Sequence, residues 1–170
     1  MRKLATLAFA TLGLTLGSYA FGQGNTATAT AVASATIITP ISISKMTDLN
    51  FDSVIGGSSS GQVVLDTAGT RTANGGATLG SGSFVTVASF AVSGQPGATY
   101  AITLPTGGIT TYNSVGNDMT VDTFVSDPSG MGSLDGMGNQ TIAVGATLEV
   151  AANQPAGVYS GFFDVSVTYN

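Results

Sequence analysis

The clearest alternation of apolar and polar residues lies in residues 157–170. Read with a period of two, one side of this stretch carries Tyr159, Gly161, Phe163, Val165, Val167 and Tyr169. The residues between them are mostly polar. Successive side chains of a strand point to opposite faces, so the alternation predicts one long strand with an apolar face, central to its domain. Because chain ends usually fray, an apolar face that continues to the penultimate residue needs a partner, in the same chain or another.

The rest of the sequence shows shorter alternating runs, separated by clusters of Gly, Asn, Asp and Pro. Residues 99–104, 119–125, 141–144 and 146–150 each predict a strand, and Asn74-Gly75 predicts a hairpin turn. In the run 119–125, Met119, Val121, Thr123 and Val125 share one face. No helical period extends over ten residues after residue 20. We therefore expect an all-β fold of eight to ten strands, an immunoglobulin-like antiparallel β-sandwich.

An extended arm precedes these strands. Residues 25–36 alternate between hydroxyl and methyl side chains, with Ala27, Ala29, Ala31, Ala33 and Ala35 on one side. Ile37, Ile38, Ile41 and Ile43 make the following part more strongly apolar, with a break near Pro40. We expect residues 21–36 to form an N-terminal arm and residues 37–170 to form the β-sandwich domain.

The first twenty residues have the pattern of a secretory signal peptide. A positive start at residues 1–3 is followed by an apolar run over residues 4–17 and by the small residues Ser18 and Ala20. Cleavage is expected after Ala20, with Gly22 as the alternative site. An apolar run of about 14 residues is too short to span roughly 30 Å of hydrocarbon, which argues against a membrane anchor. We expect the protein to pass the periplasm of a Gram-negative bacterium and to reach its surface or exterior.

Charge narrows the range of partners. After signal removal the chain keeps Lys45 and Arg71 against nine acidic residues, which gives 2 − 9 = −7. Nucleic-acid affinity depends on neutralising phosphates with Lys and Arg, so we expect no nucleic-acid partner. The same charge argues against anionic lipid surfaces, and no membrane insertion is expected after signal removal.

The sequence offers little for catalysis. There is no Cys and no His, so thiol nucleophiles, disulfides and the usual general base are missing. Asp118 and Asp122 would lie about 13 Å apart on a strand, too far for a glycosidase pair. Asp127 and Asp135 flank a Gly-rich loop that weak calcium binding would suit, but the Asp-x-Asp-x-Asp spacing is absent. We expect no enzyme, no cofactor and no metal site.

Several stretches together resemble the DUF4402 family, a group of small bacterial secreted domains of undefined function. They are the signal peptide, the Thr/Ala-rich arm, residues 35–41, residues 49–51 and residues 156–161. The resemblance covers most of residues 30–170. More loosely, the end of the chain is similar to subunits of chaperone–usher pili and to spore-coat-U-like proteins. Gly157 is fourteenth from the end and Tyr169 is penultimate, as in pilus subunits.

The pilus resemblance implies an incomplete, pilin-like sandwich that is completed by a strand from a neighbour. A periplasmic chaperone and an usher would be partners in transit, and self-association or another surface subunit would follow. The alanines from Ala27 to Ala35 would enter the neighbour's groove. Its wall would comprise Gly157, Tyr159, Phe163, Val165, Val167 and Tyr169. Methyl groups are smaller than the plugs of pilus subunits, and the arm could instead fold back as an edge strand or remain a tether.

Two functions follow from these observations. The first is a secreted, non-enzymatic structural protein of the bacterial surface, a subunit of a pilus-like filament that assembles by donor-strand exchange. The alternative is a monomeric binding module for carbohydrate or a surface ligand, with the arm folded in cis. Exposed aromatic side chains would mark its site, and Tyr112, Phe124 and Phe162 are the candidates.

Overall fold

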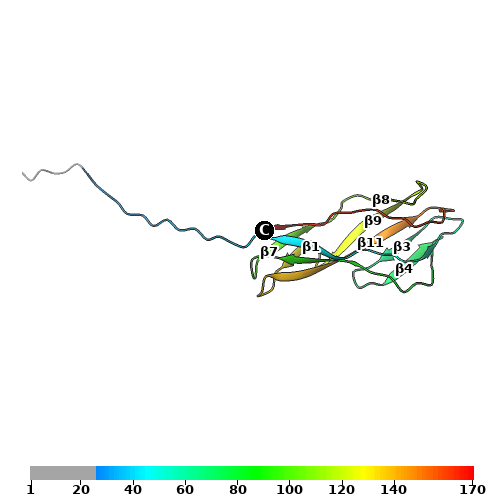
Figure 1. The fold of residues 1–170 in the computed structure, drawn as a ribbon, viewed down its shortest axis with the longest axis horizontal. Helices are drawn as coiled ribbons and strands as arrows, with labels where there is room; N and C mark the ends of the chain where they lie inside the picture. The colour runs from blue at the N-terminus through cyan, green and yellow to red at the C-terminus, as the bar shows by residue number, and fades with distance from the viewer. Residues whose placement is uncertain (1–25) are drawn as a thin grey trace, which may run out of the picture. The chain divides into compact units, whose positions relative to one another are not determined.

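The structure is a computed structural model that describes residues 26–170. The predicted signal peptide and residues 21–25 lie outside this range. The described chain divides at residue 36 into two units, of which the second is Ile37–Asn170. Residues 26–36 are exposed and belong to no strand (Figure 1). Among residues 26–170 there is no helix, and hence none that is long and apolar enough to cross a membrane.

The second unit consists of antiparallel strands. They are β1 (Ser42–Thr47), β2 (Val54–Ile55), β3 (Gly61–Leu65), β4 (Arg71–Gly75), β5 (Thr78–Leu79), β6 (Ala88–Ser93), β7 (Thr99–Thr103), β8 (Ile109–Tyr112), β9 (Asp118–Asp127), β10 (Met131–Ser133), β11 (Asn139–Val150) and β12 (Ser166–Tyr169). Seven form a large sheet in the order β1-β6-β11-β3-β4, which β9 and β8 extend from β11. A smaller sheet has the order β10-β7-β12, and β2 pairs with β5. The predicted all-β antiparallel sandwich is confirmed.

Strand β11 is the centre of the large sheet. It pairs with β6 over its first half, with β3 over its second half, and with β9 on the other side. The two short strands predicted for residues 141–144 and 146–150 are therefore one continuous strand. Gly145 lies where the partner changes, and a Cβ there would be 2.2 Å from the carbonyl oxygen of Leu65. The close approach of two backbones at this point requires glycine.

The core has two clusters that share β11. One contains Val63, Val121, Ala146, Leu148 and Val150, and the other contains Val92, Tyr100, Ile102, Ile142 and Val144, among others. Side chains that are fully buried provide most of the burial free energy, roughly 1.5–3 kcal/mol for a large aliphatic residue. With no cysteine in the sequence, this packing and the strand ladders hold the domain together.

Three connections between consecutive strands have the same loop. In each, the side-chain oxygen of the first residue accepts hydrogen bonds of 2.8–3.1 Å from the backbone N–H groups two and four residues later. The fourth residue is a glycine with a φ of +80° to +88°. The loops begin at Asp66, Asn113 and Asp135. An Asp or Asn followed three residues later by Gly is a local signal for this turn, which sequence analysis did not use.

Two local predictions were wrong. Residues 74 and 75 do not form a hairpin turn, because both lie inside β4, opposite β3. The row Met119, Val121, Thr123 and Val125 does not stay on one face. Thr123 has a φ of +47° at a register shift against β11, so Phe124 turns inward and Val125 is exposed. The extra residue of a β-bulge reverses the side-chain alternation beyond it.

Candidate functional site

The apolar face of residues 157–170, here called the C-terminal segment, is where the sequence predicted it. Its inward residues are half-buried, and the residues between them are exposed. Phe163, Val165, Val167 and Tyr169 pack on the second core cluster, and Tyr159 packs on the first. None of these side chains reaches the full burial of Ile142 or Val144 on β11. The alternation therefore predicted the direction of the side chains but not their depth.

The predicted long central strand is wrong in two respects. Only Ser166–Tyr169 form a strand, β12, and this strand lies at the edge of the small sheet. It pairs with β7 on one side, in a register that places Tyr169 opposite Tyr100. Further back, Ser160 makes an isolated bridge to Tyr112. The central position belongs to β11.

Residues 161–165 form a gap between these two attachments. Within the described chain, no backbone–backbone hydrogen bond involves any of these five residues. Phe163 nevertheless packs inward, with its ring centroid 4.9 Å from that of Phe124 and 6.4 Å from that of Phe90. An edge with free N–H and C=O groups beside an apolar cluster is a template for another strand. We call residues 161–169 the open edge.

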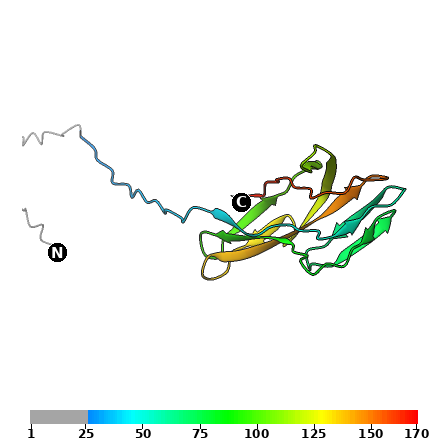
Figure 2. The ribbon, with the colours of Figure 1, turned by 45° about the vertical axis from the view of Figure 1, so that its right-hand side comes forward.

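A second unpaired edge borders the same cluster. Strand β1 pairs only with β6, so its other side carries no strand in the described chain. Ile41 and Ile43, at and just before β1, pack on the cluster that also holds Phe163 and Val165. Figures 1 and 2 both show the red C-terminal segment ending near the start of β1. At this side of the core, neither of these two edges is paired with a further strand within the described chain.

The Tyr169 hydroxyl connects the ends of this region. It donates to the carbonyl oxygen of Thr39 at 2.8 Å and accepts from the N–H of Gln95 at 2.6 Å. The N–H of Thr39 in turn donates to the side chain of Gln95. Both backbone groups of Thr39 are therefore bonded to side chains, so the chain is fixed just before β1 begins.

The two glycines of the segment allow close contact. A Cβ on Gly161 would lie 2.9 Å from the carbonyl oxygen of Thr110, and one on Gly157 would lie 2.9 Å from the amide nitrogen of the Asn113 side chain. Both distances are below any normal Cβ contact. The segment can therefore pass directly over β8 and its loop at these two points.

The predicted donor alanines lie in a part of the chain without regular structure. Ala27, Ala29, Ala31, Ala33 and Ala35 are all exposed, and residues 26–40 belong to no strand. Whether this arm pairs within its own chain or with another stays a prediction. The larger exposed apolar side chains of the same stretch are Val32, Ile37 and Ile38.

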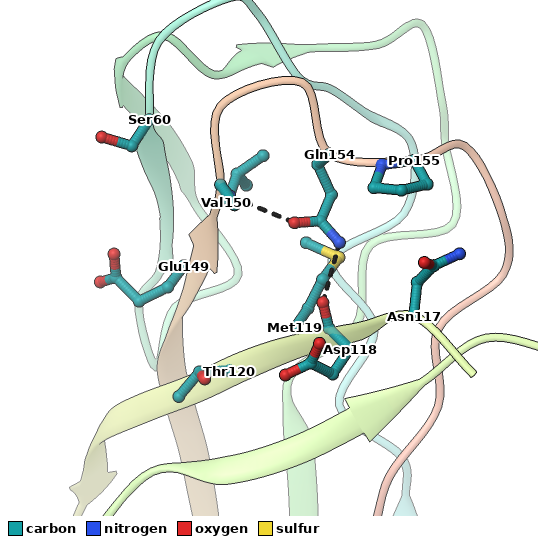
Figure 3. Close-up of a pocket in the computed structure, with 10 residues that line it drawn as sticks. Ser60, Asn117, Asp118, Met119, Thr120, Glu149, Val150, Gln154 and Pro155 are labelled. Atoms are coloured by element: carbon teal, nitrogen blue, oxygen red, sulfur yellow. Dashed lines mark hydrogen bonds between the residues drawn. The ribbon is translucent and has the colours of Figure 1, made fainter.

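A shallow polar hollow of about 380 Å³ lies at the other end of the domain, over β9 and β11 (Figure 3). Asp118 and Glu149 contribute carboxylates from neighbouring strands. The side chain of Gln154 donates to the carbonyl oxygen of Asp118 at 2.8 Å and to the Tyr159 hydroxyl at 3.0 Å, which holds one wall. The hollow contains neither a nucleophile beside a base nor an aromatic platform, so its residues do not indicate a reaction.

The acidic residues are spread over the domain. Within residues 26–170 no three carboxylates come together as a metal ligand set. Asp127 lies in the β9 ladder, whereas the Asp135 carboxylate accepts the N–H groups of its own loop, which lowers its pKa. The N–H of Phe84 likewise lowers the pKa of Asp52. The Asp135 carboxylate thus closes its own loop, whereas the Asp52 carboxylate holds the backbone of a segment distant in the sequence.

The three aromatic residues suggested for carbohydrate binding are not all at the surface. Phe124 packs in the core against Phe163, whereas Phe162 is 95% exposed and Tyr112 is 56% exposed. A stacking platform needs exposed rings, so Phe124 cannot belong to one. The binding-module alternative stays a prediction.

Comparison with protein families matches residues 41–169 to the family described as Domain of unknown function (DUF4402). This chain belongs to the DUF4402 family. The match confirms the resemblance drawn from the sequence. It includes the whole open edge and leaves out the arm. Neither the comparison with curated proteins nor that with solved structures found a match.

Proposed function

We propose that this DUF4402 protein is an exported structural subunit that associates with copies of itself by strand addition. One copy contributes its arm, residues 26–36, and the other contributes the open edge. The observation that carries the proposal is the gap at residues 161–165, where five backbone units are unpaired beside a half-buried apolar row. Strand addition would supply those hydrogen bonds and cover Phe163 and Val165.

The arm has the properties that such a strand needs. It is exposed, it has no strand of its own, and residues 26–44 contain no charged side chain. Its methyl row would face the apolar cluster, and the opposite row, made of hydroxyl groups and Val32, would face solvent. Eleven extended residues span roughly 36 Å, longer than the open edge of nine residues.

Export makes an uncovered edge hazardous, because unpaired strand edges and exposed apolar rows promote aggregation. A periplasmic chaperone and an usher are therefore the partners that we expect during transit. The predicted signal peptide supports the same route. The final location would be a filament at the cell surface or outside the cell.

Removal of the arm tests this proposal. The mature chain and a variant lacking residues 21–36 would be compared by size-exclusion chromatography and electron microscopy. We expect multimers or filaments of the mature chain and a folded monomer of the shortened chain, because the shortened chain keeps both core clusters. A mature chain that stays monomeric and is no more stable than the shortened chain would overturn the proposal.

A further inference from the structure

Ile37 differs from the rest of the exposed apolar row. Residues 27, 29, 31, 33 and 35 of this row are alanines, and the next member is Ile37. Its side chain is 96% exposed, although isoleucine is among the residues most often buried in proteins. The contacts within its own domain therefore do not account for an isoleucine at this position.

The parity of Ile37 matches that of the core residues that follow. Ile41 and Ile43 lie four and six residues further on and pack on the second core cluster. Thr39 precedes proline, which restricts its backbone to an extended conformation. In an extended chain, residues two apart point the same way, so Ile37 belongs to the apolar row. Ile38 belongs to the other row, with the hydroxyl groups, and is 52% exposed.

Thr39 marks the point from which the chain is attached to its own domain. Its N–H and C=O groups are bonded to the side chains of Gln95 and Tyr169, so the arm and the two residues that follow it precede the first fixed residue. Two residues of extended chain span about 7 Å, which leaves Ile37 close to its own domain. Binding of Ile37 to a second copy would bring the two domains into direct contact, with almost no linker between them.

We infer that Ile37, which directly follows the arm, is the main anchor of the added strand and determines the register of the arm on the open edge of a second copy. This inference rests on the proposed function. An isoleucine removes more apolar area from water than an alanine, so this residue contributes more to binding than any single methyl group of the row. The alanines then serve to let the backbones approach and pair, and Ile37 selects which pairs form.

Two matched substitutions in the full mature chain test this inference. Ile37→Asn and Ile38→Asn make the same chemical change at adjacent exposed positions outside the strands. Sedimentation equilibrium would give the apparent dissociation constant, and the melting temperature of the monomer would verify folding. We expect Ile37→Asn to weaken association by at least about tenfold, and Ile38→Asn by no more than about twofold.

The outcomes separate this inference from the function on which it rests. If deletion of residues 21–38, which removes the arm together with Ile37, abolishes association while Ile37→Asn leaves it unchanged, the anchor is wrong and the strand addition stands. A larger effect of Ile38→Asn would mean that the opposite row faces the edge, which also overturns the inference. If the deletion itself has no effect on association, the proposed function fails.

Discussion

Strand β11 and the C-terminal segment have similar patterns of apolar and polar residues but lie in different environments. Both alternate apolar and polar residues over about twelve positions, and both direct their apolar row into the same core. β11 has neighbours along both sides, and its Ile142 and Val144 are fully buried. The C-terminal segment has a strand on one side over four residues only, and its row stays half-buried.

The difference shows that the alternation of apolar and polar residues determines which side chains point inward, whereas strand pairing on both sides determines how deeply those side chains are buried. A strand paired on both sides is covered by its neighbours, but an edge leaves the same side chains partly in contact with water. The apolar row of residues 163–169 thus has the same inward direction as the row on β11 but lacks a neighbouring strand on one side. Under the proposed function, the arm of a second copy would complete it.

The largest effect is expected at Gly145, where β11 passes from one partner to the next. In Gly145→Ala the new Cβ would clash with the carbonyl oxygen of Leu65 at 2.2 Å, so the ladder must shift. We expect a loss of about 3 kcal/mol in the free energy of unfolding, measured by urea denaturation. Gly136→Ala, with nothing within 4 Å of its Cβ, is the control and should change stability by less than about 0.5 kcal/mol. Equal losses of stability in the two variants would contradict the close approach of the β11 backbone to that of β3 at this glycine.

A valine-to-alanine substitution in β11 and one in the C-terminal segment compare how deeply the two apolar rows are buried. Val144 is fully buried, so Val144→Ala should cost the monomer about 2 kcal/mol in unfolding free energy. Val165 is half-buried, and Val165→Ala should cost less than about 1 kcal/mol in the monomer. Equal costs would mean that the C-terminal segment is as deeply buried as β11, which would contradict the difference in burial between the two rows.

The Tyr169 hydroxyl provides a smaller test at the end of the open edge. Tyr169→Phe removes its hydrogen bonds to Thr39 and Gln95 and should lower the unfolding free energy by about 1 kcal/mol. Tyr112→Phe, at an exposed ring, is the matched control and should have almost no effect. The control and the variant would be compared by thermal unfolding. Indistinguishable melting temperatures would contradict the role given to this hydroxyl.

The smallest expected effect is a dependence of the protein's stability on pH. Hydrogen bonds from the loop N–H groups lower the pKa of Asp135 from its ordinary value of 3.8. A lowered folded-state pKa stabilises the protein above the ordinary value, and that stabilisation is lost as the pH falls through the lowered value. In Asp135→Asn the amide keeps the loop, as Asn113 does in its own hairpin. Melting temperatures should differ slightly at about pH 7 and converge at about pH 2. A difference that grows on acidification would contradict this account of the loop.

The sequence was sufficient to predict those structural features that depend on residues close together in the chain. Alternation predicted the inward facing of Phe163, Val165 and Val167, and short runs between turn residues predicted an all-β sandwich. The three loops beginning at Asp66, Asn113 and Asp135 were equally predictable, because their geometry depends on five consecutive residues.

Structural features that depend on residues distant in the sequence could not be predicted. β12 pairs with residues 100–103, and nothing local to residues 157–170 indicates that the other side has no strand. The bulge at Thr123, which turns Phe124 into the core, arises from the register against β11. The connection from Tyr169 to Thr39 spans 130 residues. The candidate site required the structure because it is defined by missing pairing.

Amide hydrogen exchange of residues 161–165 measures directly whether these backbone groups are unpaired and able to accept an added strand. In the monomeric chain lacking residues 21–36, these amides should exchange orders of magnitude faster than those of β11, because no backbone acceptor holds them. On addition of a synthetic peptide of residues 26–38, exchange at residues 161–165 should slow while β11 stays unchanged. Residues 161–165 that are as protected as β11 without the peptide, or that stay unprotected with it, would contradict the account.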